Sequence, residues 1–165
     1  NGSADSYVDL NPSGFVGSEA ADISGTLQVG YGWTSPTTRN DHALLWNGSA
    51  DSFVDLNPSG FKFSGAWGSN GTLQVGWGSG SATGGRTHAL LWNGSADSYI
   101  DLHQFLPSDF ILSYANDIAE NGNIVGFAYN RLGRNHAILW QVPEPASAIL
   151  IGVGCLFARL RRRQN

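Results

Sequence analysis

The feature that most constrains this chain is a phrase repeated at a nearly constant spacing. Residues 1–15 (NGSADSYVDLNPSGF) return at 47–61 with one difference, Tyr7 against Phe53. The phrase HALLWNGSADS likewise stands at 42–52 and again at 88–98. Self-similarity at this spacing is typical of proteins built by stacking supersecondary units, none of which buries its apolar face alone.

A looser third copy extends the pattern to Trp140, with SYIDL, ENGNIVGF and HAILW in the same order. The histidine that opens each HA-x-x-W phrase lies at 42, 88 and 136, so the period is 46 and then 48 residues. We therefore divide the chain into three β repeats and a C-terminal tail. Their bounds are 1–46, 47–92, 93–140 and 141–165.

Each repeat predicts about four short strands joined by tight turns. In residues 26–33 (TLQVGYGW) apolar and aromatic side chains alternate with Gln and Gly, which indicates a strand with one buried side. HALLW and SYVDL flank the polar loop NGSAD, an arrangement typical of a hairpin. NPSG supplies a second turn, because Pro restricts φ and Gly tolerates a positive φ.

The expected fold class is all-β, with tandem four-stranded repeats of the β-propeller-blade type and a C-terminal hydrophobic helix from about Ala146. A β-trefoil of three such units is the alternative. The strands are expected near 6–10, 26–33, 42–46, 52–56, 72–77, 88–92, 98–102, 123–128 and 136–140.

The order of motifs in the repeats resembles an extracellular repeat family named for its His-Ala-Phe signature (HAF repeats). The signature is represented by His42-Ala43-Leu44, His88-Ala89-Leu90 and His136-Ala137-Ile138, so Phe is replaced each time. An Asp-Leu piece follows (Asp9-Leu10, Asp55-Leu56, Asp101-Leu102), and a Val-Gly piece completes the pattern (Val29-Gly30, Val75-Gly76, Val125-Gly126). The resemblance implies a surface location and no known activity.

Charge is divided unevenly along the chain. Residues 1–142 hold five basic and twelve acidic residues, a net charge of −7. Because nucleic-acid binding requires neutralisation of phosphates, an acidic body makes nucleic acid an unexpected partner. The other basic residues cluster at the C-terminus: Arg159, Arg161, Arg162 and Arg163.

The composition changes abruptly at Gln141. Two prolines bracket Glu144, which indicates a stiff linker. Residues 146–158 follow with Ser147 as their only polar side chain, and the arginine cluster ends the apolar stretch. Thirteen helical residues extend about 20 Å, against a hydrocarbon core of about 30 Å. Positive charge at the C-terminal end favours keeping that end cytoplasmic, with the repeats outside.

Taken in order, this tail resembles the PEP-CTERM sorting domain: Pro143-Glu144-Pro145, a short apolar stretch and terminal arginines. The resemblance implies recognition by an exosortase, a membrane protease-transpeptidase of exopolysaccharide-making Gram-negative bacteria, with Pro143, Glu144 and Pro145 as the recognition motif. The protein would be anchored transiently in the inner membrane and then delivered to the cell surface or outside. A buried C-terminal helix is the alternative, although four arginines would then lie beside a core.

Equivalent positions can converge near the axis of a propeller or trefoil, so His42, His88 and His136 could together ligate a metal ion. No carboxylate accompanies them at a fixed short spacing. We therefore expect each histidine to be a strand-edge residue that hydrogen-bonds to its neighbours, and we expect neither a metal nor a cofactor.

Other repeated polar and aromatic residues admit both a binding and a structural interpretation. Asp and Asn near the turns could bind calcium, but beside Gly and Pro they are typical turn caps (Asp5, Asp9, Asn11, Asp51, Asp55, Asn57). Asn-Gly-Ser matches a glycosylation sequon and also a turn (Asn1, Asn47, Asn93). Repeat-locked tryptophans could stack on sugars, but are more typical of a core (Trp46, Trp92, Trp140).

The sequence contains no nucleophile motif and no phosphate-binding loop, and Cys155 lies in the apolar tail, where a thiol resists ionisation. We therefore expect a non-enzymatic surface or matrix protein, with an exopolysaccharide-binding module as the alternative. The chain opens inside a repeated phrase, so strand 6–10 lacks its HALLW partner. This predicts either upstream repeats in a larger ring or self-association through an open edge.

Overall fold

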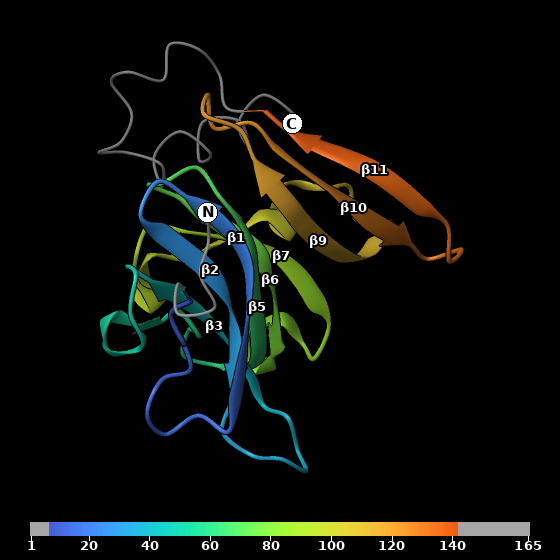
Figure 1. Cartoon of the computed structure of the whole chain (residues 1–165). Coiled ribbons are helices and arrows are strands. Elements are labelled where there is room, and N and C mark those ends of the chain that lie inside the picture. The colour runs from blue at the N-terminus through green and yellow to red at the C-terminus, as the bar shows by residue number, and fades with distance from the viewer. Residues whose placement is uncertain (1–6, 142–165) are drawn as a thin grey trace.

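The computed structural model describes residues 7–141, which form three antiparallel β-sheets and no α-helix (Figure 1). The first sheet has the order β1 (Gly17–Ser24), β2 (Leu27–Trp33), β3 (Asp41–Trp46), β4 (Val54–Asp55). The second has the order β5 (Phe61–Ser69), β6 (Gln74–Gly80), β7 (Thr87–Trp92), β8 (Ile100–Asp101). The third contains β9 (Phe110–Ile118), β10 (Ile124–Asn130) and β11 (Asn135–Trp140), with β10 in the middle.

The predicted all-β architecture is confirmed over these residues, and the expected strands near 26–33, 42–46, 72–77, 88–92, 123–128 and 136–140 correspond to β2, β3, β6, β7, β10 and β11. The predicted hairpin is also present, since Leu44 pairs with Asp55 and Leu45 with Val54. The helix expected from about Ala146 lies outside the described residues. Within 7–141 no helix is long and apolar enough to span a membrane.

Three strand predictions need correction. Residues 7–10 do not form a strand. The strands expected at 52–56 and 98–102 shrink to the two-residue strands β4 and β8, because 3₁₀-helices η1 (Ala50–Ser52) and η3 (Ala96–Ser98) occupy the loop before each. A third such turn, η4 (Leu102–Phe105), follows β8, and η2 (Ser81–Thr83) follows β6.

The first strand of every sheet was not predicted, because a bulge interrupts its alternation. The register with the second strand shifts between Ala20 and Asp22 in β1 and between Ala66 and Gly68 in β5. Period-two alternation is the signal by which strands are recognised, and an extra residue reverses it halfway. Strands β1, β5 and β9 therefore read as irregular in the sequence.

The bulges also explain the glycine of each Val-Gly pair. A Cβ placed on Gly76 would lie 1.9 Å from the carbonyl oxygen of Gly65, and one on Gly30 would lie 1.9 Å from that of Glu19. The expectation that β2 buries a single side is therefore incomplete: Gly30 and Gly32 are buried too, while Tyr31 and Trp33 stay partly exposed.

The three sheets stack in chain order, with the second between the first and the third (Figure 1). Strand β5 contacts β1, β2 and β3, and β9 contacts β5, β6 and β7. Two apolar clusters fill the junctions. The first contains Val29, Ala43, Leu45, Leu56, Phe61, Ala66, Leu90 and Trp92. The second contains Val75, Ala89, Leu91, Leu102, Ala115, Ile118, Ile124 and Trp140.

Candidate functional site

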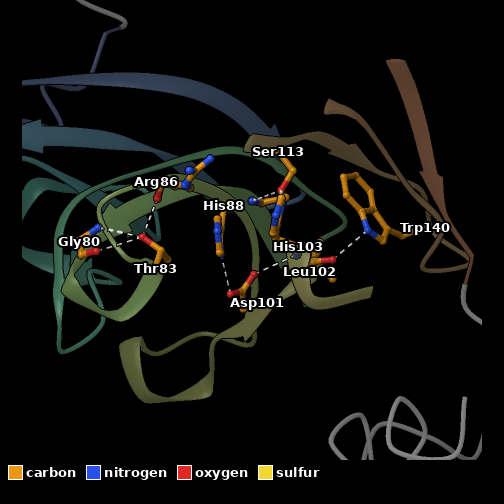
Figure 2. Close-up of polar contacts among 10 residues, drawn as sticks. Gly80, Thr83, Arg86, His88, Asp101, Leu102, His103, Ser113 and Trp140 are labelled. Atoms are coloured by element: carbon orange, nitrogen blue, oxygen red, sulfur yellow. Dashed lines mark hydrogen bonds and ion pairs between the residues drawn. The ribbon is translucent and has the colours of Figure 1, made fainter. Parts of the chain in front are cut away.

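The most concentrated polar chemistry in the described residues lies where the second sheet meets the third. His88 enters from β7, Asp101 from the end of β8, His103 from η4 and Ser113 from β9 (Figure 2). Nδ1 of His88 lies 2.8 Å from Oδ2 of Asp101. The other carboxylate oxygen of Asp101 accepts the backbone N–H of His103 at 2.9 Å, which fixes the turn into η4.

Ser113 connects this cluster to the next sheet. Its Oγ lies 2.9 Å from Nδ1 of His103 and accepts the backbone N–H of Ala89 at 2.9 Å. The side chain is fully buried, so the hydroxyl is not offered to solvent. A serine nucleophile must reach a substrate, and this hydroxyl is instead used to hold β7 against β9.

The first junction repeats the arrangement with one substitution. Nδ1 of His42 lies 2.8 Å from Oδ2 of Asp55, and Asp55 also accepts the backbone N–H of Asn57 at 2.8 Å. Ser64 donates to the Asn57 side chain at 2.7 Å and accepts the Ala43 N–H at 2.9 Å. Asn57 thus occupies the place that His103 takes in the second junction.

The two junctions differ in the basicity of their histidines. The hydrogen bond to Asp55 raises the pKa of His42. Burial, together with the neighbouring His88, lowers the pKa of His103. Relative to an ordinary histidine, His103 is therefore the harder of the two to protonate in the fold and His42 the easier.

The structure separates the three repeat histidines. His42 and His88 pair with carboxylates, and His136 has its Nε2 3.3 Å from the side-chain nitrogen of Asn130. Residues 7–141 contain no group of three or more His, Cys, Asp or Glu placed to hold a metal ion. The prediction that each histidine hydrogen-bonds to its neighbours is confirmed. No carboxylate was expected at a fixed short spacing, and the structure shows that Asp55 and Asp101, thirteen residues after His42 and His88, pair with these two histidines.

Several of the other repeated residues lie in turns or in the core, as their structural interpretation predicts. Asp9 and Asp55 accept the backbone N–H two residues ahead, as turn caps do. Asn47 and Asn93 open loops in which the next glycine has a positive φ. The repeat-locked tryptophans lie in the core, with exposed fractions of 1% for Trp46, 0% for Trp92 and 7% for Trp140.

A different aromatic group is partly exposed and crosses from the second sheet to the third. It consists of Trp67, Trp77, Tyr114, Phe127 and Tyr129 on β5, β6, β9 and β10, and we call it the aromatic row. Trp67 stacks on Tyr114 with centroids 5.8 Å apart and planes 8° apart, and Tyr114 stacks on Phe127 at 4.8 Å. Trp77 and Phe127 follow the Val-Gly pair of their repeats, as Tyr31 does in the first, but the row as a whole was not predicted because its members lie on four strands of two sheets.

His103, Ser64 and Ser113 were not predicted as members of a site. A usable signal existed, since both serines lie three residues after the phenylalanine that follows the Pro-Ser turn (Phe61 and Phe110). The predicted sorting residues Pro143, Glu144 and Pro145, the arginine cluster and Cys155 lie outside the described residues.

Comparison with known proteins bears on the tail. Residues 141–164 match the PEP-CTERM protein-sorting motif. This segment contains the Pro-Glu-Pro sequence and all four terminal arginines. The motif implies an exported protein that an exosortase processes and that is sorted to the cell surface. No curated protein and no solved structure matches the chain.

Proposed function

We propose that this chain is a non-enzymatic surface or matrix protein, in which the stacked sheets form an external scaffold and the tail delivers that scaffold to an exosortase. The PEP-CTERM match at 141–164 carries the proposal. In this scheme Pro143, Glu144 and Pro145 are recognised by the enzyme. The apolar stretch resides briefly in the inner membrane, and Arg159, Arg161, Arg162 and Arg163 hold its end on the cytoplasmic side.

The non-enzymatic role is supported by how the polar residues are used. At both junctions the histidine, aspartate and serine side chains bond to one another or to strand backbone across sheets. Ser64 and Ser113 are fully buried. Turnover of glycosidic or ester substrates by the purified protein would contradict this role.

We also propose that the sheets are blades of β-propeller type related to the HAF repeats. Support comes from the four consecutive antiparallel strands of the first two sheets, from their stacking in chain order, and from the contacts of β5 with both β1 and β9. In a propeller the first strands of successive blades are neighbours near the axis.

The sorting proposal is tested in an exosortase-containing host, with a secretory signal peptide fused ahead of residue 1. Replacing Arg161, Arg162 and Arg163 with glutamine, or residues 143–145 with alanine, should leave unprocessed protein in the membrane fraction. Replacing Arg131 and Arg134 in the body is the matched control and should change nothing. Normal processing of both tail variants, or equal processing in a strain without the exosortase, would contradict the proposal.

Binding of exopolysaccharide is the second candidate function, and the aromatic row is the observation that favours it. Aromatic faces stack on the apolar C–H faces of sugar rings. The rings of Trp67 and Tyr114 are stacked on each other and partly exposed where the second sheet meets the third, so a sugar would contact the part of the rings that remains open. Trp46, Trp92 and Trp140 are buried and present no face to a sugar.

The test is calorimetric titration of the purified chain with the host's exopolysaccharide. Trp67→Ala should weaken binding, whereas Trp33→Ala, the same change at a partly exposed tryptophan of the first sheet, should not. Circular dichroism checks that both variants fold. An absence of binding by the unaltered chain, or equal effects of the two changes, would remove this candidate.

A further inference from the structure

The two internal junctions are built from equivalent residues, so each sheet has two different faces. We call the face that packs against the preceding sheet the leading face, which in the second sheet carries Phe61, Ala66, Leu90 and Trp92. The opposite face, which packs against the following sheet, is the trailing face, and in the first sheet it carries Val29, Ala43, Leu45 and Leu56. At each internal junction a trailing face packs against the next leading face. Val29 and Leu45 on the trailing side are 0% and 8% exposed, and Ala66 on the leading side is 0% exposed.

On the trailing face of the third sheet, the apolar side chains are much more exposed to solvent than their equivalents at the two internal junctions. Val125 is 48% exposed, whereas its equivalents Val29 and Val75 are both 0% exposed. Leu139 is 54% exposed, whereas its equivalent Leu91 is 4% exposed. Ala137 is exposed as well.

On the leading face of the first sheet, apolar side chains are likewise more exposed than their equivalents in the other sheets. Ile23 is 65% exposed, whereas Ile118, its equivalent in β9, is 4% exposed. Ala20 is exposed, whereas Ala66 and Ala115 are 0% exposed. The apolar positions exposed at the two ends are therefore those that the internal junctions bury.

Each internal junction brings a histidine of one sheet together with an aspartate and a serine of the next repeat. The two end faces carry the same groups, with the histidine on the third sheet and the aspartate and serine at the first. The third sheet provides His136, which contacts Asn130 and, among the described residues, no carboxylate. The first sheet's segment provides Asp9, whose Oδ1 caps Asn11 as Asp55 caps Asn57, and for which residues 7–141 offer no histidine partner. Ser18 occupies the place of Ser64 and Ser113.

The edge strands are complementary too. In the first two sheets a third strand pairs with a short fourth strand formed by the Val-Asp or Ile-Asp of the next phrase. Among the described residues β11 pairs with β10 and with no fourth strand. Val8-Asp9 is the copy of Val54-Asp55, and Val8 is 64% exposed. Open backbone edges with this register favour strand addition.

We propose that two copies of this chain associate head to tail, with the leading face of one docked on the trailing face of the other. Val8-Asp9 of one copy extends the third sheet of the other along β11, Asp9 bonds to His136, and Ser18 accepts the N–H of Ala137. The second copy is the indicated partner because both complementary halves belong to this chain. A single copy cannot join them, because its second sheet lies between the other two (Figure 1).

The test uses the full chain in a mild non-ionic detergent, with mass measured by sedimentation velocity. Ala20→Arg blocks the leading face and Leu139→Arg blocks the trailing face. Leu132→Arg is the matched control, since Leu132 is 75% exposed in the turn between β10 and β11. The unaltered chain and the control should form complexes of two or more chains. Each blocked variant alone should associate at least about tenfold more weakly, since a charge now occupies the apolar centre of the contact.

An equimolar mixture of the two blocked variants provides the decisive measurement. The Ala20→Arg copy keeps its trailing face unaltered, and the Leu139→Arg copy keeps its leading face unaltered. These two faces can bind each other once, so the mixture should form two-chain complexes and nothing larger. Failure of the mixture to associate, or association of each variant alone as strong as that of the unaltered chain, would overturn the proposal. The second result would assign self-association to the tail that all variants share.

A polar exchange gives an independent measurement if an arginine variant does not fold. Asp9→His and His136→Asp should each weaken association, because each places like groups opposite one another. The double variant should recover it. Loss of association in the double variant equal to that in the single variants would contradict the pairing.

Discussion

The ring of His88 stacks on the ring of His103, with centroids 4.1 Å apart and planes inclined by 19°. Burial lowers the pKa of His103, and the neighbouring His88 lowers it further. The first junction has no such stack, because Asn57 stands where the second has His103. The first junction therefore shows that asparagine fits at this position, and His103→Asn is the matching substitution in the second junction.

Replacing His103 with asparagine should reduce the loss of stability on acidification. The pKa of His103 is lowered in the fold, so the unfolded chain binds the proton first as the pH falls below about 6.5. The free energy of unfolding of the unaltered chain should thus decrease from that pH down to the folded pKa, and the variant should lack this contribution. Urea unfolding at a series of pH values measures the difference. Parallel pH profiles for the two chains would contradict it.

Asp55→Asn should give a pH dependence of opposite sign. Asp55 raises the pKa of His42, so the pair contributes stability that is fully present below about pH 6.5 and is lost as the pH rises through the folded pKa. Asparagine still accepts the Asn57 N–H and removes the carboxylate. The stability gap between the unaltered chain and the variant should narrow as the pH rises above 6.5. If the difference in free energy of unfolding did not change with pH, Asp55 would stabilise the fold only by accepting the Asn57 N–H and not by pairing with His42.

Ser64→Ala and Ser113→Ala should each lower the free energy of unfolding by about 1–3 kcal/mol, because each leaves a buried backbone N–H without its acceptor. Ser18→Ala removes the equivalent hydroxyl, for which the described part of the chain offers no inter-sheet donor, and should have little effect at low protein concentration. Chemical denaturation of all three variants makes the comparison. Equal effects at the three positions would contradict a junction role for the two buried serines.

Gly76→Ala should destabilise the second sheet by about 1–3 kcal/mol or more, because a Cβ there would lie 1.9 Å from the Gly65 carbonyl oxygen and the bulge of β5 would have to move. Gly25→Ala is the control: its φ is +60° and nothing lies within 4 Å of the added carbon. The control should lose only the cost of placing a side chain in the left-handed backbone conformation, about 1–2 kcal/mol. Thermal unfolding distinguishes the two, and a milder effect at Gly76 than at Gly25 would contradict the steric argument.

Local patterns predicted the elements whose determinants are local. Alternation in residues 26–33 predicted β2, and the loop NGSAD predicted the pairing of β3 with β4. The turn formed by NPSG is also present, with Phe61 N–H bonded to the carbonyl of Pro58 at 3.1 Å. The tail was recognisable because its motif is a linear string of residues that needs no folded context to be read.

The rest depended on how the sheets stack. The bulges in β1, β5 and β9 reverse the alternation that would have revealed those strands. The bond from Ala43 to Ser64 joins residues 21 positions apart, and that from Ala89 to Ser113 joins residues 24 apart, in different sheets. The spacing of these residues in the sequence does not predict that they contact each other. The sequence by itself determined the repeats, most strands and the sorting tail, because these depend on neighbours along the chain. The tertiary structure alone decided the histidine clusters, the aromatic row and the two unequal end faces, because these depend on which faces of the sheets are brought into contact.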